Sequence, residues 1–376
     1  METLPLPLTR ELVLIGGGHA HALVLRRWGM KPLPGARLTL INPDPTAPYT
    51  GMLPGHVAGH YARDMLEIDL VRLARFAGAR LILGRVDAID REGKRVHIAG
   101  RGGIAYDIAS IDIGITSDLP GLPGFADHAV AAKPLGPFAD AWAAYRDGDG
   151  PAEIGVIGGG VGGLELSMAM AHALKTRGRP ATVTVIEAAA PAQGLGPSAK
   201  ARLLAAVAGH GVTVLAGAAA VEVTGDAVIL EGGRSVPSRF TVGVAGARPQ
   251  GWLAGTGLDL TRGFVTVDPF LRSVTDPAIY AVGDCAHIAH APRPKAGVYA
   301  VRAAAILAHN LRADLARGVR KRFDPQGDYL KLISLGGKTA LGEKWGISTT
   351  GDGSSAGPNR SSNSITSRSD VWRKSE

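Results

Sequence analysis

Two stretches of the chain share one pattern of apolar and polar positions. Each begins with a short, continuous apolar run that ends in glycines, "ELVLIGGG" (11–18) and "EIGVIGGG" (153–160). Each continues into a segment with apolar residues at helical spacing, 20–29 in the first case and 161–178 in the second. Continuous β-branched runs of this length predict strands buried on both faces, as in parallel sheets.

A second apolar run follows each predicted helix, "ARLTLINPDP" (36–45) and "ATVTVIEA" (181–188). The chain therefore contains two βαβ units, one a domain-length after the other, which indicates an internal duplication and not a short repeat. Alanines and leucines at helical spacing predict a further helix over 297–318. Shorter apolar runs predict additional strands at 79–90, 94–100, 109–115, 212–225, 227–233, 240–247, 264–274 and 279–284.

Composition narrows the class of protein. The 376 residues are 45% hydrophobic and 20% charged, which is the balance of a globular chain with two or three domains. The single cysteine, Cys285, excludes an internal disulfide and a cysteine-bound metal cluster, and it fits a reducing compartment. No signal peptide or membrane-spanning run is apparent, so we expect a cytoplasmic protein.

Charge is concentrated at the end of the chain. The net charge is +8, and the segment from 311 onward carries 12 Lys+Arg against 7 Asp+Glu, a net +5. A basic end can meet an anionic membrane surface or remain a solvated face, and no nucleic-acid-binding motif accompanies it. The Ser/Gly/Asn-rich composition of 347–376 predicts a disordered tail.

The second glycine-rich turn has the spacing of a dinucleotide-binding loop. Gly158, Gly160 and Gly163 follow a strand and open a helix, so backbone amides and the helix N-terminus can approach a pyrophosphate. Glu187 ends the next strand, where a carboxylate can accept hydrogen bonds from both ribose hydroxyls. The same carboxylate would repel a 2′-phosphate, which favours NADH over NADPH.

The first turn keeps Gly16, Gly17 and Gly18 but has His21 where the third glycine is expected. That glycine serves helix–strand packing, so the phosphate-facing part of the loop is retained and the helix should stand further from the strand. Asn42 occupies the ribose position. His19 and His21 lack a carboxylate partner, and we therefore predict no metal site.

Further motifs carry a family resemblance. They are "GGGHAH", "PYTGMLPGHVAGHY" (48–61), "SIDIGITSDLPGLPG" (110–124), "TVGVAGARPQ" (241–250), "IYAVGDCAH" (279–287) and "PKAGVYAVRAA" (294–304). Together they resemble the pyridine nucleotide-disulfide oxidoreductase superfamily, whose members have two dinucleotide-binding domains. Within it, the chain is most similar to the type II NADH dehydrogenase-like module often found fused to selenide, water dikinase.

The resemblance implies an α/β fold with two Rossmann-like domains of three-layer ββα type and a short C-terminal region. It places a discontinuous FAD-binding domain at 1–125 and 251–320 and an NAD(P)H-binding domain at 126–250. A partial C-terminal domain would follow at 321–346, before the tail. The first loop then corresponds to the FAD site and the second to the NADH site.

The resemblance also assigns residues to the two cofactors. For FAD they are Gly16, Gly18, His19, Ala20, Asn42, Thr50, Gly51, Gly114, Gly283, Asp284, Lys295 and Ala296. For NADH they are Gly158, Gly160, Gly163, Glu187 and Gly246. The helix at 296–310 would aim its N-terminus at the flavin, where Lys295 and Tyr299 are the candidate catalytic residues, and His56 and His60 are further candidate proton donors.

The redox-active cysteine pair of the disulfide reductases is missing, so electrons must pass from flavin to an external acceptor, which we expect to be a quinone. The segment 328–346 resembles the start of the membrane-contacting region of type II dehydrogenases, which would allow peripheral contact with the inner face of the plasma membrane. A flavin reductase linked to selenium metabolism and a non-catalytic flavin- or NAD-binding regulator are the alternatives.

Overall fold

Both predicted βαβ segments are present, and each lies in its own unit of the chain. The computed structural model describes residues 9–150, 152–179 and 181–352. The first unit contains 9–49, 67–115 and 247–326, and the second contains 50–66, 116–246 and the described residues from 327 onward.

The first unit is built on a five-stranded parallel sheet in the order β20-β9-β1-β2-β5. Its central strand carries the predicted apolar run, and Leu12, Val13, Leu14 and Ile15 are at most 1% exposed. The strands are β1 (Arg10–Ile15), β2 (Ala36–Asn42), β5 (Arg80–Leu83), β9 (Ile108–Ile111) and β20 (Ile279–Ala281). Such a sheet is apolar on both faces because both are covered.

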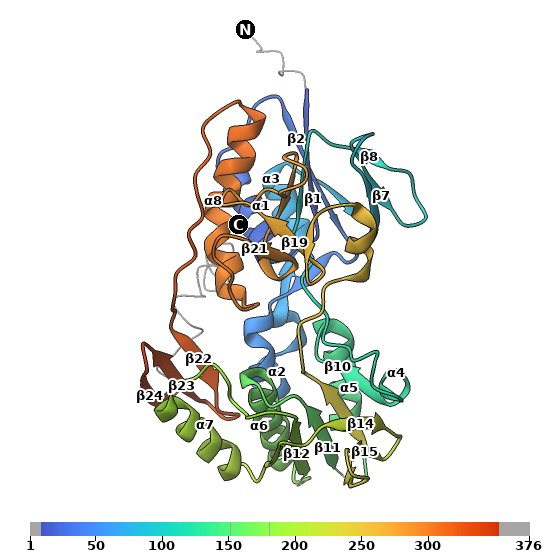
Figure 1. The fold of residues 1–376 in the computed structure, drawn as a ribbon, viewed down its shortest axis with the longest axis vertical. Helices are drawn as coiled ribbons and strands as arrows, with labels where there is room; N and C mark the ends of the chain where they lie inside the picture. The colour runs from blue at the N-terminus through green and yellow to red at the C-terminus, as the bar shows by residue number, and fades with distance from the viewer. Residues whose placement is uncertain (1–8, 151, 180, 353–376) are drawn as a thin grey trace. The chain divides into compact units, whose positions relative to one another are not determined.

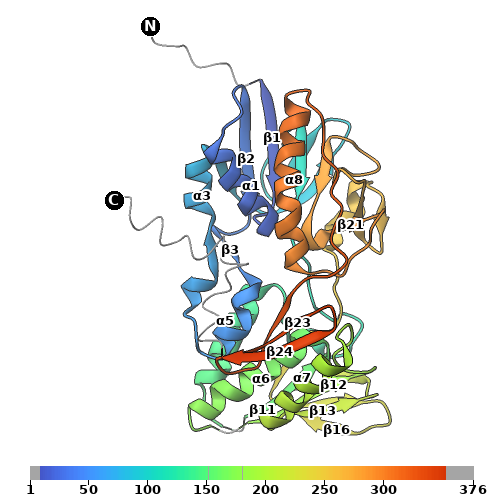
Figure 2. The same cartoon turned by 90° about the vertical axis from the view of Figure 1, so that its left-hand side faces the viewer.

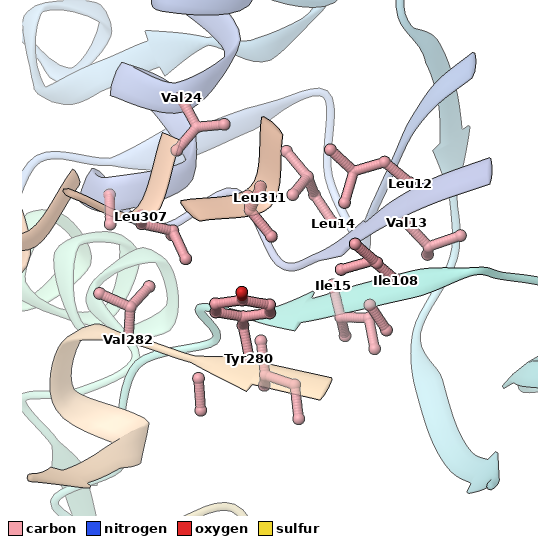
Figure 3. Close-up of a cluster of buried hydrophobic side chains, with 14 of the residues drawn as sticks. Leu12, Val13, Leu14, Ile15, Val24, Ile108, Tyr280, Val282, Leu307 and Leu311 are labelled. Carbon is pink, nitrogen blue, oxygen red and sulfur yellow. The ribbon is translucent and has the colours of Figure 1, made fainter. Parts of the chain in front are cut away.

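Three helices cover one face of this sheet, namely α1 (His19–Met30), α3 (Leu70–Ala77) and α8 (Gly297–Leu315) (Figure 2). Figure 3 shows Val24 of α1 and Leu307 and Leu311 of α8 packed with β-strand side chains around Tyr280. The same core receives side chains from a small antiparallel sheet, β6 (Val86–Asp90), β7 (Arg95–Ile98) and β8 (Ile104–Ala105). Helices, parallel sheet and antiparallel sheet form the expected three layers (Figure 1).

The remaining elements of the first unit are short. They are β3 (Thr46–Pro48) paired with β4 (Glu67–Asp69), the sheet of β18 (Leu260–Thr261), β19 (Phe264–Val267) and β21 (Ala286–Ile288), and the 3₁₀ turns η3 (Gly251–Thr256) and η4 (Gly283–Cys285).

The second unit repeats the arrangement with a parallel sheet in the order β10-β17-β11-β12-β13. Its strands are β10 (Ala129–Ala131), β11 (Glu153–Ile157), β12 (Thr182–Glu187), β13 (Thr213–Ala216) and β17 (Phe240–Gly243). Its helices are α2 (Leu53–Val57), α4 (Phe125–His128), α5 (Leu135–Asp147), α6 (Val161–Thr176) and α7 (Pro197–Gly209), with 3₁₀ turns η1 (Thr50–Met52) and η2 (Arg63–Leu66). An antiparallel sheet joins β14 (Ala220–Val223), β15 (Ala227–Leu230) and β16 (Ser235–Pro237).

The C-terminal region forms a second antiparallel sheet in this unit, made of β22 (Lys331–Ser334), β23 (Thr339–Lys344) and β24 (Ile347–Asp352). The prediction of disorder was wrong for 347–352, because these residues pair along the whole of β23 and the hairpin packs on α7 (Figure 2). The rest of the predicted tail, 353–376, lies outside the described residues.

The units defined by internal contacts do not coincide with the predicted domain bounds. The segment 50–66 belongs to the second unit because α2 packs on α6 and the indole of Trp142 donates a hydrogen bond to the Val57 carbonyl, 3.1 Å away. The second unit begins at 116, not 126, and 327–352 belongs to it. Two runs predicted as single strands, 79–90 and 212–225, are each two strands, separated at Gly84 and Gly217.

Candidate functional site

The glycine-rich loop of the second unit has the geometry of an anion site. Gly158 has φ +117°, which favours glycine, and a Cβ on Gly163 would collide with the Gly158 carbonyl oxygen. Helix α6 starts directly after Gly160 without a side-chain cap, so its first N–H groups remain available to a ligand. A Cβ on Gly160 would meet nothing within 4 Å, so the loop is open at its tip.

Glu187 holds this loop in place from the end of β12. Its carboxylate accepts hydrogen bonds from the backbone N–H groups of Gly159, at 2.6 Å, and Ala189, at 2.8 Å. A carboxylate has about four acceptor positions, so two remain for ribose hydroxyls. The side chain therefore lies where the sequence placed it, and it has a second task in fixing the glycine loop.

Asn42 occupies the matching position in the first unit. Its Oδ1 accepts a hydrogen bond from the Gly17 N–H at 2.9 Å, as Glu187 does from Gly159. Its amide group donates to the carbonyls of Asp44 and Thr46, at 2.7 and 3.2 Å. The duplication thus extends to individual hydrogen bonds, and contact of Asn42 with a ribose stays a prediction.

His21 replaces the third glycine with a buried, hydrogen-bonded ring. Its Nδ1 lies 2.7 Å from the Gly16 carbonyl oxygen and its Nε2 lies 2.8 Å from the Ser110 hydroxyl. Burial lowers the pKa of His21 to about 4, so the ring is neutral. Gly163 permits no Cβ at the matching place in the second unit, and a wider separation of α1 from its strand stays a prediction.

A buried carboxylate, Asp112, lies under the first loop at the end of β9. Its Oδ2 accepts hydrogen bonds from the backbone N–H groups of Ala20, at 2.8 Å, and His21, at 3.0 Å. Burial, with a smaller contribution from Asp284, raises the pKa of Asp112 to about 7. The sequence prediction missed this residue, although an acid inside the apolar run "ASIDIGI" was a usable signal.

A pocket opens where η4 meets the start of α8, and it brings together five predicted residues. Gly283 has φ +73°, and Ala296 is the N-cap of α8, again with no side-chain cap. Arg293 also lines the pocket, though its side chain donates to three backbone carbonyls of the surrounding loops. The pocket is lined by Gly283, Asp284, Ala286, Ile288, Arg293, Pro294, Lys295, Ala296 and Tyr299.

Comparison with known proteins adds the family. Residues 10–304 match the pyridine nucleotide-disulphide oxidoreductase family. The chain belongs to this family. The NADH dehydrogenase-like protein YutJ of Bacillus subtilis is 23% identical over 290 residues, which are 75% of this chain and 78% of that protein.

Two solved structures have the same fold. The sulfide:quinone oxidoreductase of Aquifex aeolicus has a TM-score of 0.74 at 20% identity and covers 91% of this chain and 87% of its own. NDH2 of Plasmodium falciparum, solved with NADH, has a TM-score of 0.77 at 12% identity and covers 91% of each chain. The protein is thus an NAD(P)H-dependent flavin oxidoreductase of the pyridine nucleotide-disulphide oxidoreductase family, with FAD and NAD(H) as cofactors.

The residues present fit these cofactors. The starts of α6 and α8 offer backbone N–H groups to phosphate or to an electron-rich ring edge. In the first loop, the N–H groups of Ala20 and His21 are bonded to Asp112. Asp284 lines the pocket in the first unit, and its contact with FAD stays a prediction. Within the described ranges no helix is long and apolar enough to cross a membrane, and no cluster of three metal-ligating side chains occurs.

Lys295 lines the pocket, and its ammonium group contacts a backbone carbonyl and an aromatic ring of the first unit. Nζ donates to the Ala286 carbonyl at 2.5 Å and lies 3.9 Å from the centre of the Phe264 ring. Burial lowers the pKa of Lys295. Tyr299 is 7% exposed on the first turn of α8. Their contact with flavin stays a prediction.

The other predicted residues are spread over both units. His19 packs edge-on against Tyr49, with 5.2 Å between ring centres, and Gly114 has a positive φ in the first unit. Thr50 and Gly51 form η1 in the second unit, where Gly246 also has a positive φ. His56 and His60 lie there too; His56 donates to the Tyr61 carbonyl at 2.9 Å, while Nε2 of His60 is buried without a hydrogen bond.

Cys285 is a buried thiol that donates to the carbonyls of Val282 and Ile111, at 3.2 and 3.4 Å. Burial, with the nearby carboxylate of Asp112, raises the pKa of Cys285 to about 12. The thiolate is therefore scarce at neutral pH, and the side chain is structural.

Glu165 is a second functional candidate that sequence reasoning missed. It lies partly buried on α6, and its Oε1 accepts a hydrogen bond from the Ser334 N–H at 2.6 Å. Burial raises the pKa of Glu165 to about 7. A lone acid in the apolar helix sequence "GGLELSMAMA" was the available signal.

Proposed function

We propose that the protein is an FAD-dependent NADH oxidoreductase whose electron acceptor is a quinone or a similar two-electron acceptor. The duplication of the glycine loop, with Asn42 on Gly17 and Glu187 on Gly159, carries the proposal because it provides one loop for each dinucleotide. When bound, FAD supplies the redox chemistry, taking hydride from NADH and giving electrons to the acceptor.

In this proposal the chain's own residues bind and orient the cofactors. The Gly158–Gly160–Gly163 loop brings the N-terminus of α6 to the NADH pyrophosphate, and Glu187 accepts from its ribose. Asp284 binds the sugar–phosphate part of FAD in the first unit. The uncapped start of α8 would offer its partial positive charge to negative charge on the flavin when FAD is bound.

The single cysteine supports an external acceptor. Cys285 is buried with a raised pKa, so it does not fit a thiol relay of the kind that two paired cysteines provide. One neighbour in fold is a sulfide:quinone oxidoreductase, which makes a quinone our choice of acceptor, while other neighbours are ferredoxin and persulfide reductases.

Steady-state oxidation of NADH by the full-length protein with a panel of acceptors tests this proposal. We expect turnover with a short-chain quinone and none with glutathione disulfide. Turnover only with a disulfide acceptor would replace the quinone with that disulfide. Turnover only with an iron–sulfur protein would replace the quinone with that protein. Tight NADH binding with no turnover in any acceptor would favour the regulatory alternative.

We also propose that the C-terminal sheet makes peripheral contact with an anionic membrane. Its outer face carries exposed apolar side chains, Leu330, Leu332 and Ile347, next to Trp345, which is 73% exposed. Nζ of Lys344 lies 4.0 Å from the centre of the Trp345 ring, so a cation accompanies the aromatic group. Sedimentation with anionic vesicles should remove the wild-type protein from solution and leave Trp345→Ser behind; wild-type protein that stays in solution would contradict this contact.

A further inference from the structure

The carboxylate of Asp112 lies at the N-terminal end of α1, directly under the first glycine loop. It is 3% exposed and accepts the N–H groups of Ala20 and His21, the second and third residues of the helix. These donors belong to the helix end that binds pyrophosphate in dinucleotide-binding folds. Asp112 therefore places a carboxyl group beside the expected position of the FAD diphosphate.

Two glycines of the cofactor motifs are packed against this carboxylate. A Cβ on Gly18 would collide with the Asp112 carboxylate, and a Cβ on Gly283 would lie 2.6 Å from its Oδ1. The loop and the turn at η4 thus close around Asp112, and water has little access to the group. Any charge on it is poorly screened, so a second charge brought to the loop acts on it strongly.

The charged and titratable groups that face Asp112 do not neutralise it. His21 is neutral, and its Nδ1 carries the proton because the Gly16 carbonyl can only accept; Nε2 then accepts from the Ser110 hydroxyl. Cys285 is neutral as well. Asp284 adds negative charge, and Lys295 acts on Asp284 and Cys285. An ionised Asp112 would therefore repel the diphosphate.

We propose that Asp112 couples the binding of FAD to the uptake of a proton, so that the cofactor binds to the form in which this carboxyl group is protonated. The inference rests on the proposed binding of FAD to the first unit. Asp112 acts here as a positioning residue that holds the helix end, and its charge state sets the affinity of the loop for a diphosphate.

The pKa of Asp112, raised to about 7, places this coupling at neutral pH. A bound diphosphate disfavours the ionised form further and raises the pKa again. Below about pH 7 the free protein is already protonated, and FAD binds without proton uptake. Above that pH each binding event must take up a proton, so the affinity falls by up to about tenfold per pH unit.

The test is FAD binding to flavin-free, full-length protein across the neutral range. The dissociation constant should rise between about pH 6 and about pH 8.5 by tenfold or more in the wild type. In Asp112→Asn it should stay flat and remain near the low-pH wild-type value, because the amide keeps an acceptor for the helix but carries no charge. The matched control is Asp107→Asn, just before the same strand β9. The Asp107 carboxylate accepts a hydrogen bond from the Glu11 N–H. This variant should keep the wild-type dependence of the FAD dissociation constant on pH.

Calorimetry of wild-type protein in two buffers of different ionisation enthalpy counts the protons directly and does not depend on a variant that folds. We expect uptake of close to one proton at about pH 8 and none at about pH 5.5. Tight FAD binding with no proton uptake, or the same slope in Asp112→Asn, would overturn the coupling and leave the cofactor site intact. Failure of the wild-type protein to bind FAD at any pH would overturn both.

Discussion

Three neighbouring glycines of the second loop differ in the space that surrounds their Cα atoms. Gly163 lies against the Gly158 carbonyl with no room for a side chain, whereas Gly160 borders open space with φ −66°, which any residue can adopt. Gly162 lies between them on α6, and a Cβ there would only touch Val244 at 3.9 Å. Packing therefore requires Gly163, whereas packing does not require Gly160, and we infer that Gly160 leaves space for a ligand.

Gly163→Ala should lower the free energy of unfolding by about 1–3 kcal/mol, the usual range for an overpacked contact. Gly162→Ala, the matched control, should be neutral or stabilising by up to about 1 kcal/mol because alanine is the better helix former. Urea unfolding of the three proteins measures both effects. Equal stability of the two variants would contradict the assigned contact.

Gly160→Ala should fold with wild-type stability and bind NADH at least about tenfold more weakly, because the methyl group enters the space through which a pyrophosphate approaches. Urea unfolding and a binding titration separate the two effects. An unchanged NADH affinity would place the pyrophosphate elsewhere.

Glu187 should set the preference between the two nicotinamide cofactors. Glu187→Gln keeps an acceptor for Gly159 and removes the charge that repels a 2′-phosphate, so the preference for NADH over NADPH should fall by about tenfold, or about 1.4 kcal/mol. Dissociation constants for both cofactors give this ratio. The control Glu153→Gln, at the start of β11 beside Arg239, should leave the ratio of the two dissociation constants unchanged. A wild-type protein that prefers NADPH would show that Glu187 does not repel the 2′-phosphate.

Local spacing was enough to predict the glycine loops and the place of Glu187 at the end of β12, because each of them lies within one βαβ unit. It could not predict Asp112 or its partners. Asp112 and Ser110 reach His21 from about 90 positions further along the chain, and only the pairing of β9 with β1 brings them together. The sequence shows His21 in the place of the third glycine, but it does not show which groups its ring bonds to.

Among the elements, the sheet of β22, β23 and β24 is bonded to the helices of the second unit through two glutamates. Glu343, 3% exposed on β23, accepts the Gly196 N–H at 3.0 Å and pairs with Nζ of Lys331 at 2.6 Å. Glu165 of α6 accepts the Ser334 N–H of β22. The polar composition of 347–352 hid the strand β24, because a strand paired on one side needs few apolar residues of its own.

Glu343→Ala should lower the free energy of unfolding by about 1–3 kcal/mol, since it leaves the Gly196 N–H and Lys331 without this acceptor. Glu222→Ala, on an exposed position of β14, should change it by less than about 0.5 kcal/mol. Urea unfolding followed by circular dichroism compares them. Similar effects of the two changes would mean that the C-terminal sheet adds little to the stability of the unit.

Glu165 should make stability depend on pH. The pKa of Glu165 is about 7 in the folded protein, against an ordinary value of 4.5. Between these two pH values the folded protein therefore binds more protons than the unfolded chain. The free energy of unfolding consequently falls as the pH rises through this range. Glu165→Gln should be nearly neutral at about pH 5 and more stable than wild type at about pH 8, by about 3 kcal/mol at most. Urea unfolding at both pH values tests this, and a variant that loses more stability at the higher pH would contradict the protonated state.

At the scale of the whole molecule, the chain keeps the two-loop plan of the pyridine nucleotide-disulphide oxidoreductase family and has a single cysteine. The duplicated βαβ pattern predicted this plan from sequence. The unit boundaries were less predictable, because the segment 50–66 leaves the first unit and packs on α5 and α6 through contacts distant in sequence.

Blocking the thiol should not affect electron transfer. Cys285→Ala should oxidise NADH with quinone within about twofold of the wild-type rate, because the buried thiol of Cys285 has a pKa of about 12 and takes no part as a nucleophile. Folded wild-type protein should also resist iodoacetamide. Loss of turnover in a folded, flavin-loaded variant would show that the thiol takes part in the reaction.

The most direct test of the central claim is anaerobic stopped-flow reduction of the purified protein by NADH, followed through the flavin absorbance band, with a short-chain quinone added afterwards. We predict rapid bleaching by NADH and recovery of the band on addition of quinone. A protein that carries no flavin, or whose flavin NADH does not reduce, would contradict the assignment of one dinucleotide to each loop.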